Sequence, residues 1–200
     1  MRNFLKIIFI AICLPVSALS YAKDMLIDVN VLYATPDAGS SDDFHTGKTL
    51  SVNYNYYFLS WLAATAGVFI SEEISTDPVT DVVGTYQATI ESEGITFGLR
   101  SDYLFSERNR IYGRAGLLLY KSKLTVDEFF EPGIPAGSSS DTTDGQGYYI
   151  AIAWAHSFTR RISFQLELSN MTQLDLFKGE TTRPFDLTNT GISVGLGYAF

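Results

Sequence analysis

The stretch SVGLGYAF at residues 193–200 decides the fold of this chain. Successive side chains of an extended strand point to opposite faces, and large and small residues alternate strictly here. One face carries Ile192, Val194, Leu196, Tyr198 and Phe200, and the other carries Gly191, Ser193, Gly195, Gly197 and Ala199. The Gly-x-Gly within it does not predict a phosphate loop, because no helix can follow before the chain ends. The stretch therefore predicts a terminal strand with one large apolar face.

The opposite end of the chain predicts a secretory signal peptide over residues 1–22. Arg2 and Lys6 precede an apolar run over 7–16, and small residues follow up to Ala22. This order is typical of an exported precursor that is cleaved after about Ala22. We expect residues 23–200 to form one domain.

Composition favours a β-rich protein that meets lipid. The chain has 12 Tyr, 14 Phe, 2 Trp and 16 Gly, and its single cysteine, Cys13, lies in the expected signal peptide. No apolar run after residue 22 approaches the 18 or more residues of a membrane helix. With no mature cysteine and two separated histidines, the sequence predicts no metal site and no cofactor. The acidic pairs Asp42-Asp43 and Glu72-Glu73 are predicted to be solvated loop charges, with Ca²⁺ binding as the alternative.

Eight alternating segments predict eight strands. They lie at roughly 24–34, 47–58, 61–72, 88–104, 110–122, 145–158, 161–172 and 187–200. Alternation of apolar and polar residues over about ten positions is typical of membrane-spanning strands. The sequence therefore predicts an all-β fold, an eight-stranded antiparallel up-and-down transmembrane β-barrel.

The connections between these segments alternate in length. Those at 59–60, 106–109 and 159–160 are short, and those at 35–46, 73–87, 123–144 and 173–186 are long. Short periplasmic turns opposite long external loops are typical of outer-membrane barrels, whereas a soluble sandwich, the alternative, needs no such asymmetry. Aromatic residues gather where strands meet the short turns, as expected at a lipid–water interface: Phe58, Trp61, Tyr103, Phe105, Phe158, Tyr198 and Phe200.

The terminal strand also resembles the targeting signal of outer-membrane barrels. In that signal a polar residue, a glycine and two final aromatics recur at fixed spacing, and Ser193, Gly195, Tyr198 and Phe200 stand at those places. The whole chain after the signal peptide resembles the small eight-stranded outer-membrane proteins, the OmpA-like and OmpX/Ail-like barrels. The resemblance implies a bacterial outer-membrane location, recognition by the barrel-assembly machinery and contact with outer-membrane lipid. We see no peptidoglycan-binding domain after the barrel in this sequence, so the anchoring role of the fuller OmpA type is not expected. We expect a monomer.

The inward faces of these strands predict an ion network in the lumen. The interior of an eight-stranded barrel is just wide enough for side chains to fill it. Counted from the short turns, five charged residues fall at similar depth: Asp28, Arg100, Asp102, Arg114 and Glu167. Charges removed from water must be paired, so we expect a polar core that fills the lumen. The alternative is a plug that gates a narrow pore.

One segment raises the alternative of a lipid-modifying enzyme. LELSNM at residues 166–171 resembles lipid A deacylases, which carry a histidine two places before a Ser-Asn pair. Here Glu167 occupies the place of that histidine, and a carboxylate is a poor base for the hydroxyl of Ser169. His45 and His156 are predicted to lie elsewhere, so we expect no catalytic residues and a non-enzymatic protein.

The long loops are predicted to form an acidic outer surface. The net charge is −8, while Arg108, Arg110, Arg160 and Arg161 fall at or beside the short turns. An acidic outer face repels polyanions, which excludes nucleic acid as an expected partner. Lys121 and Lys123 are exceptions, predicted to reach lipopolysaccharide phosphates from the outer face of the fifth strand.

The third loop is the predicted contact surface for an external ligand. It runs from about 123 to 144 and carries Phe129 and Phe130 between acidic residues. Exposed aromatics on a loop are a plausible partner contact. Alternatively, they fold onto the barrel rim or continue a strand. The sequence thus favours an envelope-structural protein, an adhesion-like surface protein, or both.

Overall fold

The computed structural model describes residues 25–39, 44–82, 84–131, 134–178 and 184–200. The expected signal peptide and its cleavage site lie outside these ranges. Eight long strands make up most of the described chain: β1 (Met25–Asp37), β2 (Gly47–Leu59), β3 (Leu62–Ser71), β6 (Thr85–Leu104), β7 (Asn109–Glu131), β8 (Ile134–Ser157), β9 (Ile162–Leu176) and β10 (Phe185–Ala199).

These eight strands close into a ring, which confirms the predicted fold class. Their order is β3-β2-β1-β10-β9-β8-β7-β6, and the pairing of β3 with β6 closes it. Every pairing between these neighbours is antiparallel. A closed ring leaves no free strand edge at the level of the barrel, so all ladder groups there can be paired within the protein. Within the described residues, no helix is long and apolar enough to cross a membrane.

The expectation of a long loop at 123–144 is wrong. β7 continues to Glu131 and β8 begins at Ile134, and the two strands pair from Asn109↔His156 to Glu131↔Ile134. Glycine, serine and proline made this stretch look like a loop, but small polar residues and an edge proline are tolerated when a neighbouring strand supplies the ladder.

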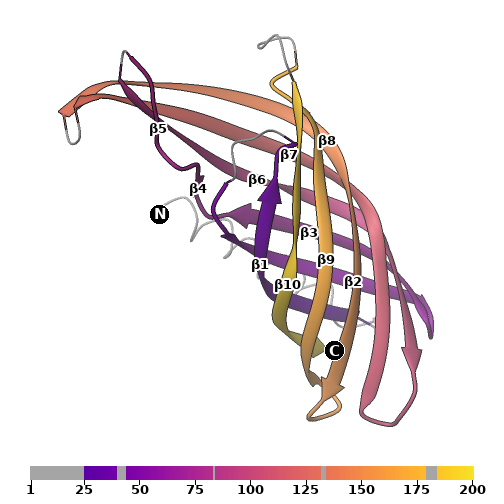
Figure 1. Ribbon diagram of the computed structural model, residues 1–200. Helices are drawn as coiled ribbons and strands as arrows, with labels where there is room; N and C mark the ends of the chain where they lie inside the picture. The colour runs from indigo at the N-terminus through magenta and orange to yellow at the C-terminus, as the bar shows by residue number, and fades with distance from the viewer. Residues whose placement is uncertain (1–24, 40–43, 83, 132–133, 179–183) are drawn as a thin grey trace.

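We name the part of the sheet beyond the ring the projecting sheet. It comprises residues 85–91 of β6, 123–131 of β7 and 134–146 of β8, together with the short strands β4 (Ile74–Ser75) and β5 (Val79–Thr80). β4 and β5 lie in the predicted second loop and pair with the outer part of β6. In Figure 1 the outer parts of β6, β7 and β8 arch away from the ring together.

The two faces of the ring differ as the alternation predicts. Large apolar side chains remain exposed on the outside, among them Leu117 (68%), Ile150 (59%) and Leu168 (54%). At the short-turn end, the seven predicted aromatics are all at least 39% exposed. A soluble monomer rarely exposes so large an apolar surface, whereas a lipid-facing barrel requires one.

Candidate functional site: the lumen and the projecting sheet

Arg100 lies at the centre of the lumen and joins two carboxylates. Its Nη1 is 2.6 Å from Asp28 Oδ2, and its Nε is 2.7 Å from Asp102 Oδ1. The Arg100 side chain is 0% exposed, and its guanidinium carbon lies 3.6 Å from the centre of the Tyr112 ring. The planar fork of arginine presents donors to two carboxylates at once in a fixed geometry, whereas lysine offers a single compact ammonium group.

A second ion pair is connected to the first. Arg114 Nη2 is 2.6 Å from Glu167 Oε1. The Tyr112 hydroxyl lies 2.7 Å from Gln165 Oε1 and 3.2 Å from Glu167 Oε2. The Gln165 amide in turn donates to Asp28. The five charged residues predicted for the lumen therefore belong to one connected network, which braces strands that are not neighbours in the ring.

The sequence reasoning missed three members of this network. Tyr112 is 1% exposed, and the Tyr57 hydroxyl donates to Asp102 at 2.8 Å. Arg110, assigned above to a short turn, instead places its Nη1 3.5 Å from Asp102 Oδ2. Alternation along β7 could have found two of them, because Arg110 and Tyr112 share a face with Arg114.

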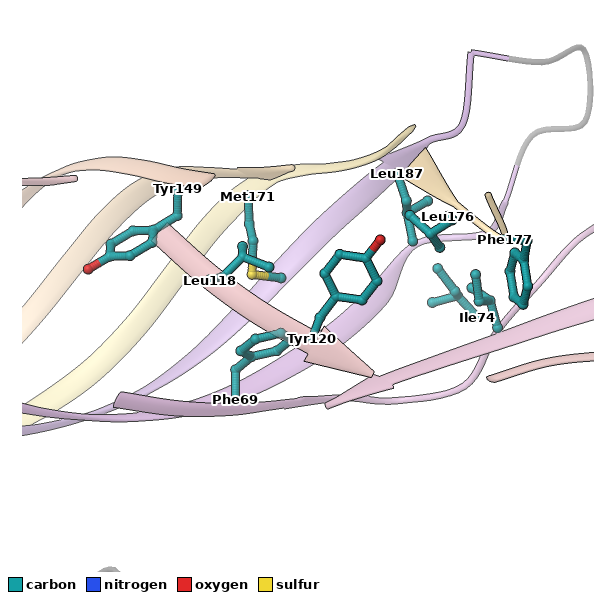
Figure 2. Close-up of a cluster of buried hydrophobic side chains, with 10 residues drawn as sticks. Phe69, Ile74, Leu118, Tyr120, Tyr149, Met171, Leu176, Phe177 and Leu187 are labelled. Carbon is teal, nitrogen blue, oxygen red and sulfur yellow. The ribbon is translucent and has the colours of Figure 1, made fainter. Parts of the chain in front are cut away.

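The lumen end near the loops is mainly apolar. A cluster that we name the apolar cap fills it: Phe69, Ile74, Ile90, Leu118, Tyr120, Tyr149, Met171, Leu176, Phe177 and Leu187. Figure 2 shows these side chains converging on a common interior from several strands. Each is at most 8% exposed. The described lumen therefore has an ionic layer toward the short turns and a mainly apolar layer toward the loops. Within the second layer Ser92, Ser122 and Gln173 form a small buried hydrogen-bonded group.

The end of β9 and the turn that follows it contribute two cap residues, Leu176 and Phe177. Asp175 and Phe177 have positive φ values of 55° and 58°, which is uncommon outside glycine. The Asp175 amide donates to Asp186 Oδ1 at 2.8 Å, and the Lys178 ammonium donates to Asp175 Oδ2 at 2.7 Å. This hydrogen bond raises the pKa of Lys178 above its usual value. Local bonds thus hold the turn in a conformation that directs Phe177 into the cap.

The geometry around Ser169 does not supply a hydrolytic site. Ser169 lies on the lumen face of β9 with Glu167, and the Glu167 carboxylate is already engaged by Arg114 and Tyr112. His45 lies 3.1 Å from Asp77, and His156 Nδ1 lies 2.9 Å from Asn109 Oδ1, so neither histidine serves this serine. Across the described ranges, no group of three or more His, Cys, Asp or Glu side chains is placed to hold a metal. Asp42 and Asp43 lie outside those ranges.

The two layers of the lumen lead to a prediction about conductance. We expect the purified barrel to show no steady channel current in planar bilayers, because a continuous ion path would have to cross both the paired charges and the apolar cap. Arg114→Ala should leave the recordings silent. Steady openings whose conductance changes with Arg114→Ala would contradict this expectation and favour a gated pore.

The predicted contact residues Phe129 and Phe130 lie on the end of β7 rather than in a loop. Phe129 is paired with Thr85 on one side and Pro135 on the other, and it is partly buried. Phe130 is 67% exposed. The aromatic pair therefore divides into one residue held within the projecting sheet and one presented to the outside.

Lys121 and Lys123 lie exposed on the outer face of β7, but they are flanked by carboxylates. Lys123 Nζ is 3.2 Å from Glu91 Oε1, and Lys121 is directly opposite Glu93 in the ladder. The Lys123 charge is therefore already partnered within the protein. Phosphate binding by these lysines would have to compete with the glutamates, and contact of Lys121 and Lys123 with lipopolysaccharide stays a prediction.

The terminal strand β10 closes the ring between β1 and β9. Ser193 and Gly195 face the lumen, and the rings of Tyr198 and Phe200 pack edge to face with centroids 4.8 Å apart. The Phe200 amide donates to the Met25 carbonyl at 3.0 Å, so the last residue is tied to the first described one. Recognition of these residues by the assembly machinery stays a prediction.

Three solved structures of bacterial outer-membrane or surface proteins share this fold. Ail, the attachment invasion locus protein of Yersinia pestis, is 11% identical, with 90% of this chain and 100% of that chain covered and a TM-score of 0.56. OprG from Pseudomonas aeruginosa is 15% identical, with 90% and 96% covered and a TM-score of 0.56. Neisserial surface protein A is 11% identical, with 88% and 97% covered and a TM-score of 0.54. At these identities the likeness establishes the fold alone.

Sequence comparison supplies the family. Among curated proteins, no sequence matches this chain significantly. A family model does match, over residues 7–200, and its description is the outer membrane protein beta-barrel domain. The match spans nearly the whole chain and agrees with the closed eight-stranded ring. The chain belongs to the outer membrane protein beta-barrel family.

Proposed function

We propose that this protein binds an extracellular partner through the projecting sheet and is not an enzyme, with the closed barrel serving as its anchor. The length of β8 carries the proposal. β8 has 24 residues, whereas a strand that crosses an outer membrane needs about 9–11. Residues 134–146 pair with β7 alone among the described strands. At about 3.3 Å per residue they reach on the order of 40 Å beyond the ring.

The outer edge of β8 offers backbone groups for recognition. Residues 137–142 are exposed, and the β9 ladder begins only at Gly147↔Gln173. Natural edge strands are commonly protected by charged side chains, proline or a bulge, and within residues 138–142 the one charged residue is Asp141, with no lysine or proline. An extended peptide can add to such an edge as a further strand. We therefore infer a partner that presents an extended segment.

The charge of the projecting sheet indicates which class of partner it can bind. The projecting sheet carries Asp127, Glu128, Asp141 and Asp144, with Lys123 paired to Glu91. Complementary charge promotes association and like charge opposes it. A structure of Ail is in complex with the heparin analogue sucrose octasulfate. The acidic sheet of this chain favours a neutral or basic segment instead, with exposed Phe130 as an apolar anchor beside it.

Shortening the hairpin tests the proposal. Thr125 and Ser140 are directly paired. Replacing residues 126–139 by Asn-Gly therefore joins them through a tight turn and keeps the register of the remaining β7–β8 ladder. We expect intact cells carrying the shortened barrel to lose at least about tenfold in binding to host cells and matrix proteins, on the scale of a lost binding hot spot. Surface amount and heat-modifiable folding must be equal. Undiminished binding, or no binding by the unaltered barrel, would contradict the proposal.

Proline substitution separates edge pairing from side-chain contact. Backbone N–H groups of alternate residues point toward β7 and toward the free edge. Proline placed singly at Ser138, Ser139 and Ser140 should therefore give an alternating pattern. The variants in which proline removes an N–H that points to the free edge should keep the β7–β8 pairing folded but lose partner binding. Equal binding by all three variants would exclude strand addition.

A further inference from the structure

A groove crosses the lipid-facing side of the ring from β6 to β10, with Leu62 of β3 at its other margin. It has a volume of about 750 Å³, which falls in the range of about 300–1,000 Å³ for small-molecule sites. Its floor is formed by small residues and its walls by large apolar ones. The floor residues are Ser101, Gly113 and Ala115, and the walls include Leu99, Ile150 and Leu168.

The floor of the groove is open where a side chain would fit. A Cβ atom added at Gly113 would meet nothing closer than the Ala151 carbonyl oxygen at 3.8 Å, which is ordinary contact. By contrast, a Cβ at the lumen-facing Gly116 would come within 2.6 Å of the Gly98 Cα. Crowding therefore explains the glycine at 116 but not the one at 113. The outer position remains small although the fold leaves room for a larger residue.

The end of the groove toward the loops is polar. Asn170 and Thr190 line it there, and the Asn170 amide donates to the Thr190 hydroxyl at 2.8 Å. The two residues are directly paired across β9 and β10, on the outer face that carries Leu168 and Ile192 nearer the short turns. An amide and a hydroxyl on a lipid-facing surface retain donors that hydrocarbon cannot satisfy.

From this combination we propose that the groove holds one acyl chain of an outer-leaflet lipid A molecule. The chain lies along Ala115 and Gly113, and its ester or amide carbonyl accepts a hydrogen bond at Asn170 and Thr190. Lipid A is the chosen occupant because the polar end faces the loop side, where the outer leaflet has its head groups. The proposal rests on membership in the outer-membrane family and is independent of the proposed surface binding.

The expected energetic effects are modest, because lipid tails are as apolar as the groove itself. Association within a membrane depends on close packing and on hydrogen bonds rather than on the hydrophobic effect. Asn170→Leu should weaken lipid A retention about threefold, on the scale of one hydrogen bond in a membrane. Filling the floor with Gly113→Leu and Ala115→Leu should weaken it about tenfold, because the chain loses its packing surface.

Native mass spectrometry of the purified barrel, released from detergent micelles with added lipid A or phosphatidylethanolamine, tests the proposal. Ala66→Leu is the matched control, because Ala66 is also a small, exposed residue on the outer face but lies on β3 beside Tyr54 and Phe97. Urea midpoints and heat-modifiable migration should show that every variant is folded.

We expect the unaltered barrel and Ala66→Leu to retain one lipid A, and the floor-filled variant to lose it. The proposal would be overturned if the floor-filled variant retained as much lipid A as the unaltered barrel. It would also be overturned if the unaltered barrel retained phosphatidylethanolamine as well as lipid A and lost both lipids when Gly113 and Ala115 are replaced. A dimer that the floor-filled variant disrupts would assign the groove to a second copy of the chain instead.

Discussion

Replacing Arg100 by leucine is expected to destabilise the folded barrel by about 3–5 kcal/mol, the range found when one partner of a buried ion pair is removed. The variant leaves Asp28 and Asp102 without the guanidinium that lies 2.6 Å and 2.7 Å from them. Water does not reach this position, since the Arg100 side chain is 0% exposed. Urea unfolding in phospholipid vesicles, followed by tryptophan fluorescence, measures the loss.

Two further variants separate charge from geometry. Arg100→Lys keeps one positive charge but loses the planar fork that spans both carboxylates. Its stability should therefore lie between that of the unaltered protein and that of Arg100→Leu. Combining Arg100→Leu with Asp28→Asn should recover part of the lost stability, because it removes one unpaired buried charge. Comparison of the single and double variants then gives the interaction energy between Arg100 and Asp28. An Arg100→Leu barrel as stable as the unaltered one would show that the network contributes nothing to folding.

The ring and the ionic layer could be predicted because both follow from alternation. Period two places Asp28, Arg100 and Glu167 on one face of their strands whatever the register between strands. Depth counted from the short turns then brings them together. The connections through Tyr112 and Gln165 depend on side-chain reach across the lumen, and sequence spacing does not specify that reach.

The apolar cap could not be predicted in the same way. Residues 117–120 of β7 read Leu-Leu-Leu-Tyr, so both faces are apolar and alternation no longer identifies the inward one. Phe177 enters the cap from a turn whose positive φ values fall on Asp175 and Phe177 rather than on a glycine, so the sequence does not mark that turn. The outer parts of β7 and β8 could not be predicted as strands for a different reason. Their serines and glycines show no alternation of apolar and polar residues, although the two strands pair with each other along their length.

A glycine pair in the wall of the barrel gives the other prediction of large effect. Gly98 on β6 and Gly116 on β7 are directly opposite each other, and Gly116 is in turn opposite Tyr149 on β8. A Cβ atom at Gly98 would overlap the Ala115 carbonyl oxygen, and it would lie 2.6 Å from the Tyr149 hydroxyl and 2.8 Å from the Gly116 Cα. Two of these three neighbours are backbone atoms that cannot move away without breaking the ladder.

We therefore expect Gly98→Val to cost about 3 kcal/mol or more, at or above the upper end for overpacked sites. Gly113→Val is the matched control, because it places the same side chain on β7 at a position whose nearest neighbour is 3.8 Å away. The control should stay within about 1 kcal/mol of the unaltered protein, as expected for an uncrowded surface site. Urea midpoints in vesicles and the fraction of heat-modifiable folded barrel measure both. Equal stability of the two variants would mean that the wall can relax around a side chain at Gly98, and the close approach of β6 and β7 would then not explain the glycine pair.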